Sequence, residues 1–176
     1  MGPPHEVVAE NAYRKAAAAA GGAAGGANAA AAAAAGANAA GGATAAHAAD
    51  RLVLGADTIV TLGGRIYGKP AGVEEARATL GALAGHRHAV LSGLCLIESG
   101  RVRTAVATTL VELRALDEAM LDWYLGTGEW SGRAGAYAIQ GRGAALVRSI
   151  EGDYLNVVGL PVATLLELAP EVLGVP

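Results

Sequence analysis

The sequence of 176 residues contains a single cysteine, Cys95, so an internal disulfide framework is excluded. Its formal net charge of −3 provides no basic surface for nucleic acid or for an anionic membrane. No apolar run approaches the roughly 20 residues of a transmembrane helix, and no segment has the charged start and apolar core of a signal peptide. We therefore expect a soluble, cytoplasmic protein with neither nucleic acid nor a membrane as a partner.

Lysine is scarce as well, because only Lys15 and Lys69 are lysine among the 13 lysine and arginine residues. A compact ammonium group on a flexible stem suits a crowded phosphate or carboxylate site that a planar guanidinium would not fit. The two lysines are therefore candidates for binding an anionic group. Chance usage is the alternative.

Large side chains are nearly absent from residues 16–50, where alanine and glycine dominate. Repeated Gly-Gly pairs interrupt helix formation, and no large apolar group is available to dock this segment. We predict that residues 1–20 carry the N-terminal helix of one α/β domain, at residues 6–20. Residues 21–49 are then a disordered low-complexity insert, and residues 50–176 form the main part of the domain.

The remaining sequence alternates between strand-like and helix-like patterns. Apolar runs on either side of Gly63-Gly64 predict a β-hairpin, and further runs at residues 88–97 and 102–113 predict a second hairpin. Helical spacing, N-caps and terminal glycines predict helices at residues 73–83, 117–126 and 161–168. This order favours a mixed, twisted sheet flanked by helices.

The first predicted hairpin brings a carboxylate and an ammonium close together. If residues 63 and 64 form the loop, Thr58 lies opposite Lys69, with Asp57 as its neighbour, and opposed Cβ atoms are about 4.5–5.5 Å apart. Phosphoryl transfer needs a carboxylate that holds metal and cations that neutralise charge. Asp57 and Lys69 are candidates for these two roles, and an ordinary turn aspartate with a nearby ion pair is the alternative.

Other polar residues are weaker candidates. Gln140 follows a strand-like run, and its amide can donate and accept at once, as reading a base edge requires. Glu129 and Asp153 are interpreted as solvated surface charges. His86 and His88 flank Arg87, but no third ligand is identifiable, so we do not expect a zinc site.

Several segments together resemble the Maf family of nucleoside triphosphate pyrophosphatases. They occur in the family's order and cover residues 5–20 and 51–170. The matching segments are Lys15-Ala16, Leu54-Gly55-Ala56-Asp57-Thr58, Gly68-Lys69-Pro70, Leu83-Ala84-Gly85 with His88, Ala134-Gly135-Ala136-Tyr137-Ala138-Ile139-Gln140-Gly141, and Gly152-Asp153-Tyr154 through Val157-Val158-Gly159-Leu160-Pro161.

The resemblance implies a Maf/inosine-triphosphatase-like α/β fold and hydrolysis of a nucleoside triphosphate to the monophosphate and pyrophosphate, with a divalent cation, Mg²⁺ or Mn²⁺, as cofactor. It implies that Asp57 is the proton acceptor for the attacking water and a metal ligand. Lys15 and Lys69 would bind phosphate oxygens, and Thr58 and Gln140 would help to choose the base. The Asp-Thr pair and the Ile-Gln-Gly segment resemble the subgroup acting on dTTP and UTP, with modified nucleotides as further substrates.

The chain also departs from the family pattern. Met1-Gly2-Pro3-Pro4 stands in place of a strand and a Ser-x-Ser-Pro-Arg-Arg loop, and Asn11 stands where an apolar helix residue is expected. Lacking that segment, the site would have no arginine clamp and the sheet would have an exposed edge, which favours a homodimer or aggregation. Two functions therefore stay open: a dTTP/UTP pyrophosphatase, and a catalytically impaired nucleotide-binding remnant with a regulatory or structural role.

Overall fold

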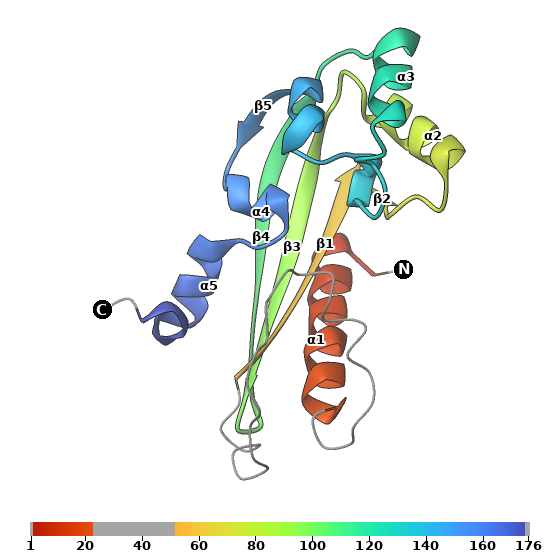
Figure 1. Ribbon diagram of the computed structural model, residues 1–176. Helices are drawn as coiled ribbons and strands as arrows, with labels where there is room; N and C mark the ends of the chain where they lie inside the picture. Colours follow the sequence, from red (N-terminus) through yellow and green to blue (C-terminus); the bar gives the residue numbers. More distant parts are fainter. Residues whose placement is uncertain (1, 23–51, 175–176) are drawn as a thin grey trace.

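The computed structural model describes residues 2–22 and 52–174. Its centre is a five-stranded sheet with the order β2-β1-β3-β4-β5, and every described strand pair is antiparallel (Figure 1). The strands are β1 (Val53–Leu62), β2 (Arg65–Tyr67), β3 (Arg87–Glu98), β4 (Arg101–Leu113) and β5 (Val147–Glu151). Helices flank this sheet, so the expected α/β class is confirmed.

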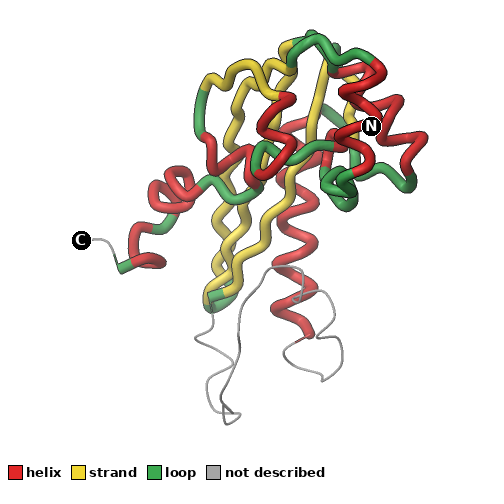
Figure 2. Tube along the Cα trace, turned by 45° about the horizontal axis from the view of Figure 1, so that its top comes forward, coloured by secondary structure: helices red, strands yellow, loops and turns green. Residues whose placement is uncertain are grey.

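The helices lie on both faces of the sheet. They are α1 (Pro4–Gly22), α2 (Val73–Leu83), α3 (Glu118–Gly126), α4 (Tyr154–Val158) and α5 (Val162–Leu168), with short 3₁₀ turns η3 (Ala134–Ala136), η4 (Gly141–Leu146) and η5 (Pro170–Leu173). Helix α1 packs along one face of β1 and β3, whereas α2, α3 and α5 pack on the other face (Figures 1 and 2). The long strands β1, β3 and β4 separate these layers.

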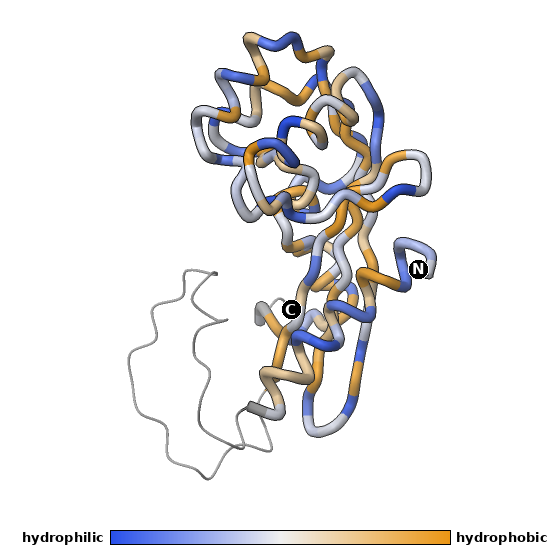
Figure 3. The backbone as a smooth tube through the Cα atoms, turned by 90° about the vertical axis from the view of Figure 1, so that its right-hand side faces the viewer, coloured by the Kyte–Doolittle hydropathy of each residue, from blue (hydrophilic) through white to orange (hydrophobic). Residues whose placement is uncertain are grey.

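Helix α1 is held by a stripe of small and apolar side chains. Val8, Ala12 and Ala16 are fully buried, and they recur every four residues, which places them on one side of the helix. Hydrophobic and hydrophilic residues are interspersed in the part of this helix nearest the N-terminus (Figure 3), whereas residues 16–20 are all alanine. The helix runs unusually close to the sheet, because an added Cβ at Gly55 would lie 2.2 Å from the carbonyl oxygen of Ala12. The absence of a side chain at Gly55 therefore determines how closely α1 packs against β1.

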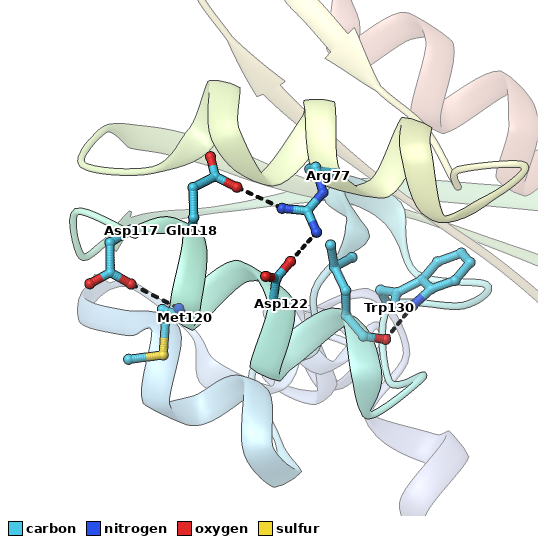
Figure 4. Close-up of polar contacts among 7 residues, drawn as sticks. Arg77, Asp117, Glu118, Met120, Asp122 and Trp130 are labelled. Carbon is cyan, nitrogen blue, oxygen red and sulfur yellow. Dashed lines mark hydrogen bonds and ion pairs between the residues drawn. The ribbon is translucent and has the colours of Figure 1, made fainter.

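The opposite face of the sheet carries the largest hydrophobic core. It contains buried side chains of β1, β3, β4, α2 and α3, among them Val60, Leu80, Val90, Val111 and Tyr124. Outside this core, the guanidinium of Arg77 on α2 bridges to the carboxylates of Glu118 and Asp122 on α3 (Figure 4). Figure 4 also shows the N-cap of α3, where Asp117 accepts from the backbone N–H of Met120 at 2.8 Å. These polar contacts thus hold α2 against α3 and cap the start of α3.

Most predicted elements occur close to the predicted residues. The helices at 73–83, 117–126 and 161–168 and the two strands of the second hairpin are confirmed within two residues at each end. Strand β5 and helix α4 were not predicted. Helix α1 continues to Gly22, and the rest of the predicted insert, residues 23–49, lies outside the described residues. Within residues 2–22 and 52–174, no helix has the length and apolar character needed to cross a membrane.

Candidate functional site

The site is built where α1 crosses β1. Alternation along β1 directs Asp57 to the same face as Gly55 and Ile59, which is the face that α1 covers. On the neighbouring strand β3, Gly93 pairs with Asp57, and an added Cβ at Gly93 would lie 2.5 Å from the carbonyl oxygen of Val8. Because neither glycine has a side chain, the helix backbone reaches the sheet and its polar side chains reach Asp57.

Two α1 side chains bind the carboxylate of Asp57. The Nζ of Lys15 lies 2.5 Å from Oδ1 and donates a second hydrogen bond to the carbonyl of Ala56 at 3.0 Å. The Nδ2 of Asn11 donates to Oδ2 at 2.9 Å. The Asp57 side chain is only 15% exposed, whereas that of Lys15 is 53% exposed. A nearly buried carboxylate therefore has one cation and one amide as partners, and the cation is open to solvent.

The structure thus brings Lys15 and Asp57 together, although they are far apart in the sequence. Sequence reasoning gave Lys15 a phosphate-binding role but noted Asn11 only as a departure from an apolar pattern. The signal that could have found Asn11 is its spacing, because it lies four residues before Lys15 and so on the same side of α1. Asn11 is the site residue that the sequence interpretation missed.

The predicted pairing of Lys69 with Thr58 is wrong. The first hairpin has the expected register at Val60–Tyr67 and at the two following pairs, but β2 ends at Tyr67. Beyond β2, the carbonyl of Gly68 accepts a hydrogen bond from the N–H of Gly135 at 3.1 Å. The chain at Gly68 therefore lies beside η3 and no longer pairs with β1. Lys69 is exposed, and its side chain forms no hydrogen bond or ion pair with the other described residues.

Thr58 lies on the face of β1 opposite to Asp57. Its hydroxyl shares a hydrogen bond of 2.7 Å with the hydroxyl of Ser92, its partner in the β1–β3 ladder. Ser92 is fully buried and donates to the backbone carbonyl of Asn156 in α4. Asn156 in turn donates to the carbonyl of Val90 and to the hydroxyl of Thr109, each at 3.0 Å. Thr58 is therefore fixed by a buried polar network below α4.

Asp153 belongs to the same network, so its interpretation as a solvated surface charge is wrong. Its Oδ1 accepts from the N–H of Leu155 at 2.7 Å and caps the N-terminus of α4. Its backbone N–H and C=O both pair with the hydroxyl of Thr109. The second carboxylate oxygen is buried and has no hydrogen-bond partner among the described residues. Asp153 thus fixes the start of α4.

Gln140 lies at the tip of a loop that a carboxylate holds in place. Its side chain is exposed and forms no hydrogen bond or ion pair with the other described residues. The two oxygens of Glu129 accept from the backbone N–H groups of Arg142 and Gly143 at 3.1 and 3.0 Å. Glu129 is therefore a structural anchor of the Gln140 loop, and its interpretation as a solvated surface charge is wrong.

The segment before Gln140 is fixed by a buried histidine. The Nε2 of His88 and the hydroxyl of Tyr137 share a hydrogen bond of 2.8 Å, and both side chains are buried. Burial lowers the pKa of His88, opposed by the nearby carbonyl of His86, and burial raises the pKa of Tyr137. A neutral histidine and a protonated tyrosine therefore hold this segment against β3.

A divalent cation fits the donor chemistry of the Asp57 site. The described part of the chain gathers no group of three histidine, cysteine, aspartate or glutamate side chains that could hold a metal by themselves. Mg²⁺ is commonly bound by one or two carboxylates together with substrate phosphates and water. Asp57 can supply such a carboxylate, so the residues present fit a cation that arrives with a phosphate-bearing substrate.

Comparison with known proteins adds the family. A family model described as Maf-like protein matches residues 1–172. Curated relatives named dTTP/UTP pyrophosphatase include one from Pyrococcus furiosus, 47% identical over 116 residues, and one from Halalkalibacterium halodurans, 50% identical over 114 residues. Another from Gloeobacter violaceus is 48% identical over 124 residues.

These alignments cover only part of each protein. They include 66%, 65% and 70% of this chain for the relatives from Pyrococcus, Halalkalibacterium and Gloeobacter, and 61%, 60% and 65% of the relatives themselves. This chain therefore spans about three fifths of the length of the curated relatives that it matches.

Proposed function

Because this chain belongs to the Maf family, we propose that it hydrolyses a nucleoside triphosphate to the nucleoside monophosphate and pyrophosphate. The observation that carries the proposal is the nearly buried carboxylate of Asp57 with the ammonium of Lys15 at 2.5 Å. The names of the relatives support dTTP and UTP as substrates. Modified nucleotides, which those names do not mention, are proposed as further substrates.

In the proposed reaction, Asp57 accepts a proton from water while the water oxygen attacks the α-phosphorus. The bond between the α-phosphorus and the oxygen that bridges to the β-phosphate breaks, and this oxygen leaves with pyrophosphate. A carboxylate that is mostly buried and held by two donors has a defined direction, as a general base requires.

The two lysines are proposed to bind the phosphate oxygens. Lys15 is half exposed, so its flexible stem can turn its Nζ from Asp57 to a phosphate. Lys69 is exposed and unpaired among the described residues, and it is therefore free to bind an anion. A divalent cation, Mg²⁺ or Mn²⁺, held by Asp57 and phosphate oxygens, would neutralise the charge that develops on the phosphates.

We propose that Gln140 and Thr58 recognise the nucleobase of the substrate. Thr58 lies on the face of β1 opposite to Asp57, and the turns η3 and η4 next to Gln140 pack into the core on that same face. Because β2 pairs with β1 only at Val60–Leu62, a nucleotide with its phosphates at Asp57 would have to pass the edge of β1 beside Thr58 for its base to reach these two groups. The exposed amide of Gln140 can donate and accept with a pyrimidine edge. The hydroxyl of Thr58 is already held by Ser92, so it would present its remaining hydrogen-bonding capacity in a fixed direction.

A nucleotide screen tests this proposal. The chain is incubated with dTTP, UTP, CTP, ATP and GTP in the presence of Mg²⁺ or Mn²⁺, and pyrophosphate is measured. Release of pyrophosphate with a preference for dTTP and UTP is expected. Nucleotide binding without pyrophosphate would contradict hydrolysis, and release of single phosphates would place the cleaved bond elsewhere.

A further inference from the structure

Asp57 is held from one helix by two side chains of different chemistry. Asn11 and Lys15 are four residues apart and therefore point from the same side of α1. They bind different oxygens of the carboxylate: the Nζ of Lys15 binds Oδ1, and the Nδ2 of Asn11 binds Oδ2. The carboxylate is thus fixed at both ends.

The two partners differ in what happens when substrate arrives. Lys15 is half exposed and, under the proposed function, turns toward a phosphate. Asn11 is half-buried, short and uncharged, so a phosphate does not attract it away from Asp57. During the reaction, Asn11 is then the donor that remains on the carboxylate.

Asn11 has no comparable value for the helix itself. Asparagine lowers helix stability relative to alanine or leucine, because its side chain competes with the backbone for hydrogen bonds. Its neighbours Val8 and Ala12 already bury the apolar side of α1. Among the described residues, the hydrogen bond to Asp57 is the polar contact of the Asn11 side chain, and it accounts for a polar residue at this position.

We propose that Asn11 is a positioning residue for the reaction: it holds Oδ2 of Asp57, so that Oδ1 meets the attacking water once Lys15 has turned to the phosphates. This inference rests on the proposed function. A neutral donor is suited to this role, because it orients the carboxylate without supplying a positive charge that would weaken Asp57 as a base.

Steady-state kinetics on three α1 variants test the role. Asn11→Ala removes the donor and favours the helix, Asn11→Gln keeps an amide, and Arg14→Ala is the matched control on the exposed side of α1. We expect Asn11→Ala to lower kcat by about tenfold to a hundredfold with little change in KM, since small displacements of a catalytic group have effects of this size. Asn11→Gln should recover part of kcat, and Arg14→Ala should leave it unchanged.

The split between kcat and KM separates this role from a structural one. Asn11→Ala leaves Oδ2 of the nearly buried Asp57 carboxylate without its donor, which the better helix propensity of alanine offsets only in part. The kinetics are therefore measured at a temperature where circular dichroism shows every variant fully folded, so that a lower kcat does not come from unfolding. A wild-type kcat in Asn11→Ala would overturn the proposal. So would an equal loss in Asn11→Gln and Asn11→Ala.

An NMR measurement keeps this inference separate from the proposed activity. The side-chain amide of Asn11 is assigned by its disappearance in Asn11→Ala and is then compared between wild type and Asp57→Ala. A clear shift toward the position of a solvated amide supports the contact, whether or not the chain releases pyrophosphate. An unmoved resonance overturns it. A wild type without pyrophosphate release, in contrast, contradicts the proposed function alone.

Discussion

A methyl group added at Gly55 should separate α1 from β1, the strand that carries Asp57. In Gly55→Ala, the new Cβ would lie 2.2 Å from the carbonyl oxygen of Ala12 and 2.7 Å from the backbone nitrogen of Ala16. Both atoms belong to the helix backbone, so no side-chain rotation can relieve the clash. Because ordinary contacts between such atoms are about 3.5 Å, the helix has to withdraw by roughly 1 Å.

This withdrawal has two measurable consequences. Overpacking of this kind typically destabilises a protein by about 1–3 kcal/mol, which corresponds to a melting temperature lower by about 2–4 °C per kcal/mol in a chain of this size. It also lengthens the contacts of Asn11 and Lys15 with Asp57, which are 2.9 and 2.5 Å now. We therefore expect kcat for pyrophosphate release to fall even at temperatures where Gly55→Ala is fully folded.

Thermal unfolding followed by circular dichroism, together with the pyrophosphate assay, checks this prediction. Gly81→Ala is the matched control, because Gly81 is in α2 with no atom within 4 Å of an added Cβ. It should stabilise the protein by about 0.5–1 kcal/mol, as alanine does in helices. If Gly55→Ala had the same melting temperature as Gly81→Ala and kept its kcat, the close docking of α1 would have no role in stability or in the site.

Two further predictions concern the segment that carries Gln140. Glu129→Ala leaves the N–H groups of Arg142 and Gly143 without their acceptor. Urea unfolding should therefore show a free energy of unfolding lower by about 1–3 kcal/mol, and the KM for nucleotide should rise. Unchanged values of both would contradict the anchoring role. His88 has a pKa below its ordinary 6.5, so its stabilising contribution is complete above about pH 6.5 and is lost as the pH falls below that value, where the unfolded chain binds the proton more readily. Urea unfolding at about pH 7.5 and 5.5 should therefore show a larger loss for wild type than for His88→Asn, and equal losses would refute the assignment.

Local sequence patterns were sufficient for most of the secondary structure. Alternation, Gly63-Gly64 and the cap at Asp117 depend on neighbouring residues, and the elements that they predict are present. The N-terminal helix predicted at residues 6–20 is also present as α1, since helical composition needs no tertiary information. These predictions succeeded because short-range geometry determines them.

The errors arose where a distant partner decides the structure. Lys69 does not follow the hairpin, because Gly68 binds Gly135, which is far away in the sequence. Glu129 was interpreted as a solvated charge, but its partners are backbone N–H groups 13 and 14 residues later. No pattern of side chains in the sequence predicts such a contact. Asn11 was missed for the same reason, since its value depends on the docking of α1 against β1.

Hydrolysis in ¹⁸O-labelled water tests the central claim most directly. Wild type and Asp57→Asn are given dTTP or UTP with Mg²⁺, and the label is located in the products by mass spectrometry. Attack at the α-phosphorus with Asp57 as base predicts that ¹⁸O appears in the nucleoside monophosphate and not in pyrophosphate. It also predicts that Asp57→Asn, while folded like wild type, releases almost no product. Label in pyrophosphate, or undiminished turnover by Asp57→Asn, would contradict the proposed reaction.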